Sequence, residues 1–192
     1  MGVGCTHIVP VHEDNYPDAE RKAAEILEWF KRRDIVENDL SDCLLGKDKS
    51  GYRFKPAIES IVSPSDRPYA EALFKHPPQT FGLDLYVGER TIFHPMEGAS
   101  LEAACPHCGH VQDDDYVSDF LSGWLDAAND YPRCQGCGTK QHITAYRFEQ
   151  DWGFSNIGVS MWNFPGHPTG EFLDEMRALF GTEGVRVVPV HL

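Results

Sequence analysis

Two Cys-x-x-Cys pairs, each followed at once by a glycine, have the clearest chemistry in this chain. A turn of this kind directs two sulfur atoms at one point, and the glycine allows the positive φ angle that the turn needs. Two such turns supply four thiolates, the tetrahedral ligand set that Zn²⁺ accepts at Zn–S distances of about 2.3 Å. We therefore predict one zinc ion per chain. The predicted ligands are Cys105, Cys108, Cys134 and Cys137.

A closed set of four thiolates leaves no coordination position for a substrate, so we expect the metal to be structural. Two disulfide bonds would also use four cysteines, but an intracellular chain keeps its thiols reduced. A thioredoxin-like redox centre usually needs one such pair at a helix N-terminus, not two that face each other. Iron also suits four sulfurs, and zinc is favoured because no surface for a redox partner can be read from the sequence.

The spacing of the cysteines resembles the double knuckle of zinc-ribbon and rubredoxin-like proteins over residues 105–139. The resemblance implies that the four cysteines are the ligands. His107 and His110 do not fall on ligand positions of that family, and they would take part only in a mixed Cys-His site. Apolar residues at helical spacing between the knuckles predict a helix over about residues 115–128.

The remaining pattern predicts an α+β fold, in which helices cover a mostly antiparallel sheet. We expect residues 1–104 and 140–192 to form one domain and residues 105–139 to form an inserted zinc-ribbon lobe. The segments 9–12 and 188–191 both read Val-Pro-Val-His, so the two terminal strands are expected in one sheet. Pro10 cannot donate to a strand ladder and should lie at an edge or at a strand end.

Alternating apolar residues predict two strands, 81–87 and 91–94, joined by a turn. Residues 141–148 and 156–164 read as the two strands of a hairpin. Two helices carry terminal signals. Ser63 would cap a helix that runs to about Lys75, and Thr169 would cap a helix that ends at about Phe180.

The chain of 192 residues has a formal net charge of −13 at pH 7. Binding to duplex nucleic acid depends on Lys and Arg contacts to phosphate, so this charge argues against a nucleic-acid partner. We expect another protein as the partner, and a basic one would suit the charge. No run approaches the roughly 20 apolar residues of a membrane span, and residues 1–10 lack a secretory signal. A cytoplasmic location is expected, and the oligomeric state stays open.

Catalytic residues do not form a recognisable motif, and we assign none. The histidines His94, His107, His110, His142 and His167 are scattered, and neither a His-Glu-x-x-His nor a Gly-x-Ser-x-Gly sequence is present. A nucleophilic Cys5 or Cys43 would need a depressed pKa. We therefore expect a non-enzymatic protein that acts through protein interaction. The alternative is a small enzyme with a pocket beside the sheet and a purely structural zinc, and a cleft that holds either two histidines or a His–carboxylate pair with a shifted pKa would favour it.

The opening of the chain carries a second resemblance. The segment 7–10, His-Ile-Val-Pro, followed by Asp14-Asn15 and an amphipathic helix, is similar to uncharacterised bacterial proteins of comparable length. Some of these proteins are labelled sugar ABC transporter ATPases. That label implies a Walker phosphate loop, which this sequence lacks, so we do not transfer the activity. The resemblance implies a bacterial, cytoplasmic setting.

Overall fold

A six-stranded sheet forms the centre of the computed structural model, which describes residues 2–46, 50–96 and 99–192. Its strand order is β2-β3-β4-β7-β1-β8, and every neighbouring pair is antiparallel. The predicted α+β class is therefore confirmed. The six strands are β1 (Gly4–Pro10), β2 (Val36–Ser41), β3 (Gly51–Phe54), β4 (Gly82–Phe93), β7 (Gly153–Trp162) and β8 (Val185–His191).

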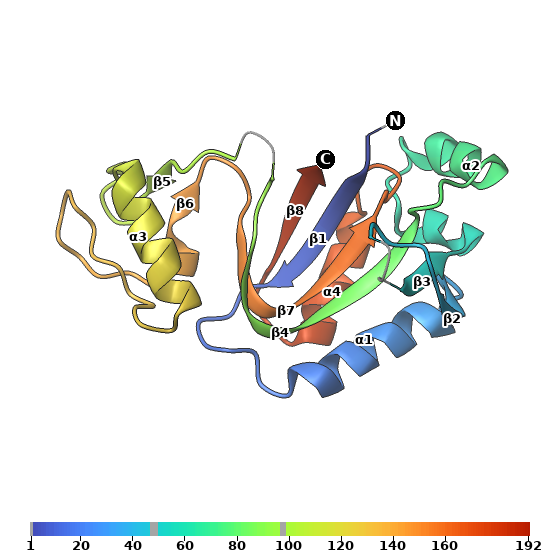
Figure 1. The fold of residues 1–192 in the computed structure, drawn as a ribbon, viewed down its shortest axis with the longest axis horizontal. Helices are drawn as coiled ribbons and strands as arrows, with labels where there is room; N and C mark the ends of the chain where they lie inside the picture. The colour runs from blue at the N-terminus through green and yellow to red at the C-terminus, as the bar shows by residue number, and fades with distance from the viewer. Residues whose placement is uncertain (1, 47–49, 97–98) are drawn as a thin grey trace.

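The other elements lie around this sheet (Figure 1). They are the helices α1 (Ala19–Arg32), α2 (Arg67–Lys75), α3 (Asp114–Leu125) and α4 (Gly170–Phe180), the 3-10 turns η1 (Pro56–Ile61) and η2 (Ile143–Ala145), and the short paired strands β5 (Ala103–Ala104) and β6 (Arg147–Phe148). Figure 1 shows α3, β5 and β6 gathered at one end of the molecule and α2 at the opposite end.

The two terminal strands are neighbours, as the sequence predicts. β1 pairs with β8 along its whole length, from Gly4 opposite His191 to Pro10 opposite Val185. β1 lies inside the sheet, so Pro10 is tolerated because it is the last residue of its strand. Pro189 lies within β8, which is the outer strand of the sheet, where a missing N–H is also tolerated.

Helices α1 and α4 cover one face of the sheet. Phe30 of α1 and Phe172 of α4 are almost completely buried, and their ring centroids are 6.0 Å apart. Both belong to a core cluster that includes Ile8 and Val159 from the central strands. The predicted ends of α4 are confirmed, because the Thr169 hydroxyl accepts a hydrogen bond from the Phe172 N–H and Gly181 ends the helix with a φ of 67°.

Two strand predictions are wrong. The turn expected between residues 87 and 91 is a bulge within one long strand, because β4 pairs with β7 on both sides of it. The hairpin expected between residues 141–148 and 156–164 does not form. β7 is hydrogen-bonded to β4 on one edge and to β1 on the other, so it has no free edge, and β6 pairs with β5 instead.

The start of α2 also differs from the prediction. The helix begins at Arg67, with Asp66 and not Ser63 as its preceding residue. The Ser63 hydroxyl donates a hydrogen bond to the Asp66 carboxylate at 2.7 Å, so Ser63 is engaged by a side chain and does not cap the helix. The residue that signals the start of the helix in the sequence thus has another role in the folded chain.

A second hydrophobic cluster lies between α3 and the first residues of β7. Trp124 of α3 and Phe154 of β7 pack edge to face, with ring centroids 5.3 Å apart. Arg90, in the bulge of β4, reinforces this junction. Its guanidinium forms an ion pair with Asp130 and donates hydrogen bonds to the Trp124 carbonyl at 3.0 Å and to Asn15 Oδ1 at 2.9 Å. The α3 region is therefore attached to the sheet by apolar packing and by one arginine.

Candidate metal centre

The two Cys-x-x-Cys turns have the same backbone geometry. The Gly109 N–H donates to the Cys105 carbonyl, and the Gly138 N–H donates to the Cys134 carbonyl, both at 2.9 Å. The two glycines have φ angles of 75° and 72°. A side chain at either position would be strained, so the glycine that follows each pair is explained by the turn itself.

The two turns bring all four predicted ligands together. Their sulfur atoms lie within 4.8 Å of one another. Cys105 Sγ is 4.0 Å from Cys137 Sγ, and Cys108 Sγ is 3.7 Å from Cys134 Sγ. These distances exclude disulfide bonds in this structure, because a disulfide holds its sulfurs at about 2.05 Å. All four cysteines are free thiols.

The cluster fits a metal ion of zinc size. Four sulfurs in a tetrahedron, each about 2.3 Å from a central ion, are separated from one another by about 3.8 Å. The two measured separations of 4.0 Å and 3.7 Å bracket that value. The donor set is soft and uniform, which suits Zn²⁺ or iron and disfavours Mg²⁺ or Ca²⁺. A metal bound here would be held by this chain alone.

Burial divides the four cysteines into two inner and two outer ligands. Cys105 and Cys134 are 0% and 1% exposed and belong to the hydrophobic cluster beside α3. Cys108 and Cys137 are exposed. The first cysteine of each turn therefore anchors the site to the core, while the second closes it from the solvent side.

A buried glutamine joins the two turns, and sequence reasoning did not identify it. Gln112 is 2% exposed, and its side-chain amide donates to the His110 carbonyl at 2.8 Å. The same nitrogen lies 3.5 Å from Cys134 Sγ. Its Oε1 accepts a hydrogen bond from the Gln135 N–H at 2.8 Å. Gln112 thus fixes the first turn against the second and donates toward a ligand sulfur.

Hydrogen bonds favour the thiolate form of Cys134 and Cys137. Burial opposes ionisation of Cys134, but hydrogen bonds from the backbone of Cys137 and Gly136 and from Gln112 outweigh it and lower its pKa to about 6. The Thr139 hydroxyl and backbone likewise lower the pKa of Cys137. Cys134 and Cys137 therefore ionise more easily than an ordinary cysteine, which favours metal binding at neutral pH. At Cys108 a backbone hydrogen bond from His110 acts in the same direction, but burial and the neighbouring cysteine thiols outweigh it and raise the pKa to about 12.

The histidines do not join the cysteine cluster. Within the described part of the chain, the cluster of potential metal ligands consists of the four cysteines. His107 and His110 are exposed, and His110 packs against Gly136, where an added Cβ would lie 2.6 Å from its ring. His94 stacks on Trp152, with ring centroids 5.0 Å apart. Packing thus accounts for His94 and His110, and His107 is a surface residue outside the cluster.

The two remaining cysteines are unsuited to nucleophilic chemistry. Burial, together with the nearby Asp84 carboxylate, raises the pKa of the Cys5 thiol to about 12. Cys43 is completely buried and packs against Gly82 so closely that a side chain there would collide with its sulfur. The depressed pKa that the sequence analysis required of a nucleophile is therefore reversed at Cys5.

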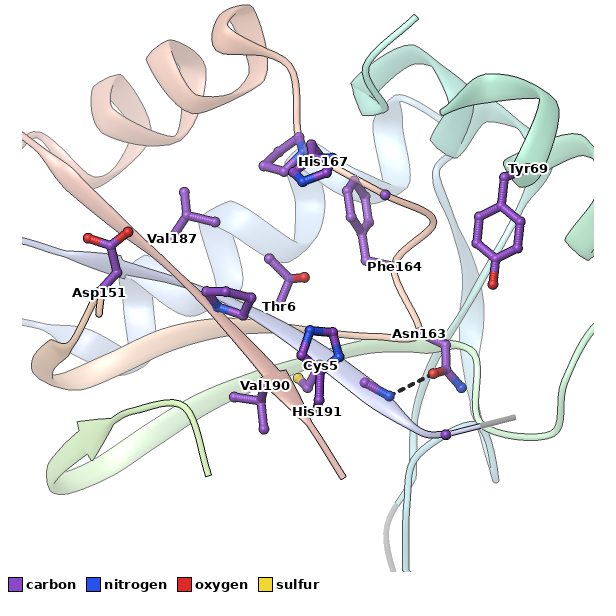
Figure 2. Close-up of a pocket in the computed structure, with 15 residues that line it drawn as sticks. Cys5, Thr6, Tyr69, Asp151, Asn163, Phe164, His167, Val187, Val190 and His191 are labelled. Carbon is purple, nitrogen blue, oxygen red and sulfur yellow. Dashed lines mark hydrogen bonds between the residues drawn. The ribbon is translucent and has the colours of Figure 1, made fainter. Parts of the chain in front are cut away.

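A histidine and a carboxylate meet at a different place. His167 Nδ1 lies 3.0 Å from Asp66 Oδ2. His167 also lines a cleft of about 620 Å³ (Figure 2). The two residues are 101 positions apart. His167 is recognisable in the sequence as a candidate histidine, but its contact with Asp66 is not, because no local pattern indicates a contact over that separation.

No protein-family model, curated protein or solved structure matches this chain. The resemblance to the zinc-ribbon knuckle is therefore supported by the cysteine geometry alone. The resemblance of the opening residues to bacterial proteins gains no support. Among the described residues, no helix has the length and apolar character needed to cross a membrane.

Proposed function

We propose that this chain binds one Zn²⁺ ion through its four clustered cysteines and that the ion is structural. The observation that carries the proposal is the set of four sulfurs within 4.8 Å of one another. With a thiolate at every tetrahedral position, no position is left for a substrate or a reactive water. The chain's own residues therefore hold and orient the ion, and the ion fixes the positions of the two turns.

The ion would contribute folding energy to a region with few elements of its own. Four-cysteine and related zinc sites supply about 10–16 kcal/mol of binding free energy in isolated zinc-finger peptides. Here the ion would join residues 105–110 to residues 134–139, and α3 lies between them in the chain. Loss of the ion is expected to release this region first.

Metal analysis tests the proposal directly. Protein purified under reducing conditions should contain about one zinc per chain by plasma mass spectrometry, and Cys134→Ser should contain much less. Cys43→Ala serves as the control because Cys43 lies outside the cluster. The same mass spectrum separates iron from zinc, since it counts each element. A metal-free wild-type protein would contradict the proposal.

We further propose that the protein acts by binding another protein, and a basic partner suits the net charge of −13. Complementary charge mainly accelerates association, so this interaction should weaken steeply as salt is raised. The measurement is the association rate with a purified partner at about 20 mM and about 300 mM salt. An association rate that is the same at both salt concentrations would contradict the proposal that the partner is attracted by charge.

A second candidate function is a small enzyme in which the zinc is purely structural. One specific observation favours it, namely the cleft beside the sheet that is lined by His167, whose ring lies 3.0 Å from the Asp66 carboxylate behind it. Carboxylate-paired histidines in clefts are characteristic of general acid–base sites. This candidate and the metal proposal are independent, because the cleft does not include any of the four clustered cysteines.

A further inference from the structure

Four segments of the chain form most of the cleft. One wall is the segment after β7, which carries Phe164 and His167, and another is α2, which carries Tyr69. Parts of β1 and β8 are the other two segments. Figure 2 shows His167, Phe164 and Tyr69 around the same space as Val190 and His191 of β8. At about 620 Å³, the cleft has the size of a small-molecule site.

Asp66 holds His167 by two hydrogen bonds. Its Oδ2 accepts one from the backbone N–H of His167 at 2.8 Å and one from ring Nδ1 at 3.0 Å. The same oxygen also accepts a hydrogen bond from the Ser63 hydroxyl. These hydrogen bonds lower the pKa of Asp66 to about 2, so the carboxylate is ionised at neutral pH. An ionised carboxylate can only accept, so the proton of the neutral ring lies on Nδ1.

The unprotonated ring nitrogen of His167 is Nε2. In the described part of the chain, nothing is hydrogen-bonded to it, and the side chain is 86% exposed at the cleft. A histidine with its proton fixed on one nitrogen by a carboxylate presents the other nitrogen as a base. The ring is therefore both oriented by Asp66 and accessible from the cleft, which are geometric conditions for proton transfer.

The backbone around His167 is built for this contact. Gly166 has a φ of 98°, and a Cβ at this position would collide with the Asp66 side chain. The His167 carbonyl accepts from the Ser63 N–H at 2.8 Å, and Val62 and Pro168 form a β-bridge next to it. Contacts before and after His167 in the chain thus connect its segment to the segment that carries Asp66.

The lining of the cleft indicates the class of ligand. None of its 15 lining residues is lysine or arginine. The lining includes apolar side chains such as Phe164, Val187 and Val190, and Asp151 contributes a carboxylate. An anionic ligand would find no cation to replace its water, so the cleft suits an uncharged or cationic small molecule.

We propose that the cleft is a general-base site for uncharged or cationic small molecules, with His167 Nε2 as the base and Asp66 as its positioning residue. This inference rests on the second candidate function. In the simplest reaction, Nε2 takes a proton from water as the water oxygen bonds to the acyl carbon of an ester. The C–O bond to the leaving alkoxide or phenoxide then breaks, and the imidazolium returns its proton to the solvent or the leaving group.

The probe is p-nitrophenyl acetate, an uncharged ester, given to the zinc-loaded full chain. The wild type should release p-nitrophenol at least about tenfold faster than His167→Gln, since positioned general bases contribute 10²–10⁴-fold in enzymes. His76→Gln is the matched control, because His76 is an exposed histidine outside the cleft lining and should leave the rate unchanged. Equal rates for wild type and His167→Gln would overturn the proposal.

Asp66→Asn tests the positioning role with His167 still in place. The rate should fall several-fold, and nitrogen NMR of His167 should change from the Nδ1–H tautomer to a mixture of tautomers. A tautomer that is the same in wild type and Asp66→Asn would refute the role of Asp66. Thermal unfolding of each variant accompanies the assay, so a rate loss counts only for a variant that remains folded at the assay temperature.

The ligand class is tested by charge. An analogue of the ester with a carboxylate on the nitrophenyl ring should be hydrolysed by wild type no faster than by His167→Gln. Equal wild-type hydrolysis rates for the uncharged ester and the carboxylate-bearing ester would reject the proposal that the cleft takes uncharged or cationic ligands. Zinc content is measured on the same samples, so failure of the base proposal in protein with one zinc per chain leaves the metal proposal standing, and the reverse also holds.

Discussion

At the scale of single residues, Gln112 supports the four-cysteine cluster although it is not one of the candidate ligands. It links the two cysteine turns and donates toward Cys134 Sγ. Partners of this kind orient ligands and tune their basicity. The four cysteines could be predicted from spacing because each turn is local. Gln112 could not, because its role depends on the second turn, which lies 23 residues further along the chain.

Gln112→Ala should weaken metal binding while the four cysteines remain in place. Loss of a supporting hydrogen bond at a metal site typically costs 10–100-fold in metal affinity. Competition with a coloured zinc chelator measures the affinity. The control is Gln141→Ala, whose side chain is not hydrogen-bonded within the described residues. An affinity equal to that of the wild type would mean that Gln112 only fills space.

Asp66 gives a pH dependence whose sign follows from its pKa. Hydrogen bonds from Ser63 and His167 lower that pKa from 3.8 to about 2. The ionised carboxylate therefore stabilises the fold above about pH 4, and this contribution is lost as the pH falls from about 4 to about 2. Asp66→Asn should be less stable than wild type near pH 6, and the difference should vanish near pH 2.

Urea unfolding at a series of pH values measures that difference. Loss of metal at low pH affects both proteins alike and cancels in the comparison. Asp119→Asn, on an exposed position of α3, is the control and should show little difference at either pH. A gap that grows on acidification would contradict the assigned direction of the pKa shift.

At the scale of elements, the predicted ends of α4 are confirmed, whereas the predicted partner of β7 and the predicted start of α2 are wrong. The Thr169 cap and the Gly181 end of α4 are local and were predicted correctly. The sequence predicts a hairpin for β7 because a second segment with a strand pattern, residues 141–148, precedes it in the chain. Its real partners, β4 and β1, are distant in sequence, and they leave it no free edge. Strand pairing is decided by the whole sheet, which no window of sequence contains.

Gly181→Ala should destabilise the fold by about 1 kcal/mol, because Gly181 has a left-handed φ of 67° that a Cβ disfavours. The matched control is Gly170→Ala at the other end of α4, where an added Cβ meets open space and the backbone is not left-handed. That variant should be neutral or slightly more stable. Equal losses for both variants in thermal unfolding would contradict the C-terminal role of Gly181.

Arg90→Ala should cost about 3 kcal/mol of stability, because it leaves the Asp130 carboxylate without its partner in a half-buried place. The side chains of Arg90 and Asp130 are 11% and 23% exposed. Arg21→Ala is the control, since its ion pair with Glu25 is exposed and such pairs contribute about 0–1 kcal/mol. A loss for Arg90→Ala as small as that of Arg21→Ala would mean that apolar packing alone attaches α3.

At the scale of the whole molecule, two hydrophobic clusters are extensive, and a third is confined to a few residues of β1, β4 and β8. Of the two extensive clusters, the larger is built on the sheet with α1 and α4, and the smaller includes two of the four cysteines. The division into a main domain and an inserted lobe at 105–139 remains a prediction. The smaller cluster also contains Trp152 and Phe154, which lie outside the predicted lobe, so a physical test of its boundary is worthwhile.

Hydrogen exchange after metal removal provides that test. A zinc chelator with reductant should increase amide exchange over residues 103–148, while β1 and β7 stay protected because they lie in the centre of the sheet. Restoring zinc should restore protection. Uniform exchange across the whole chain would show that the two clusters unfold together.

The paired turns have a further consequence for the chain as a polymer. A metal bound to Cys108 and Cys134 closes a loop across 26 positions. In the chain-entropy description, a covalent cross-link of that span reduces the freedom of the disordered ensemble by roughly 3–4 kcal/mol. A coordinated ion imposes the same restriction without a bond that cellular thiols can reduce. This metal cross-link would instead be opened by competition for the ion, so the availability of zinc would influence how long it lasts.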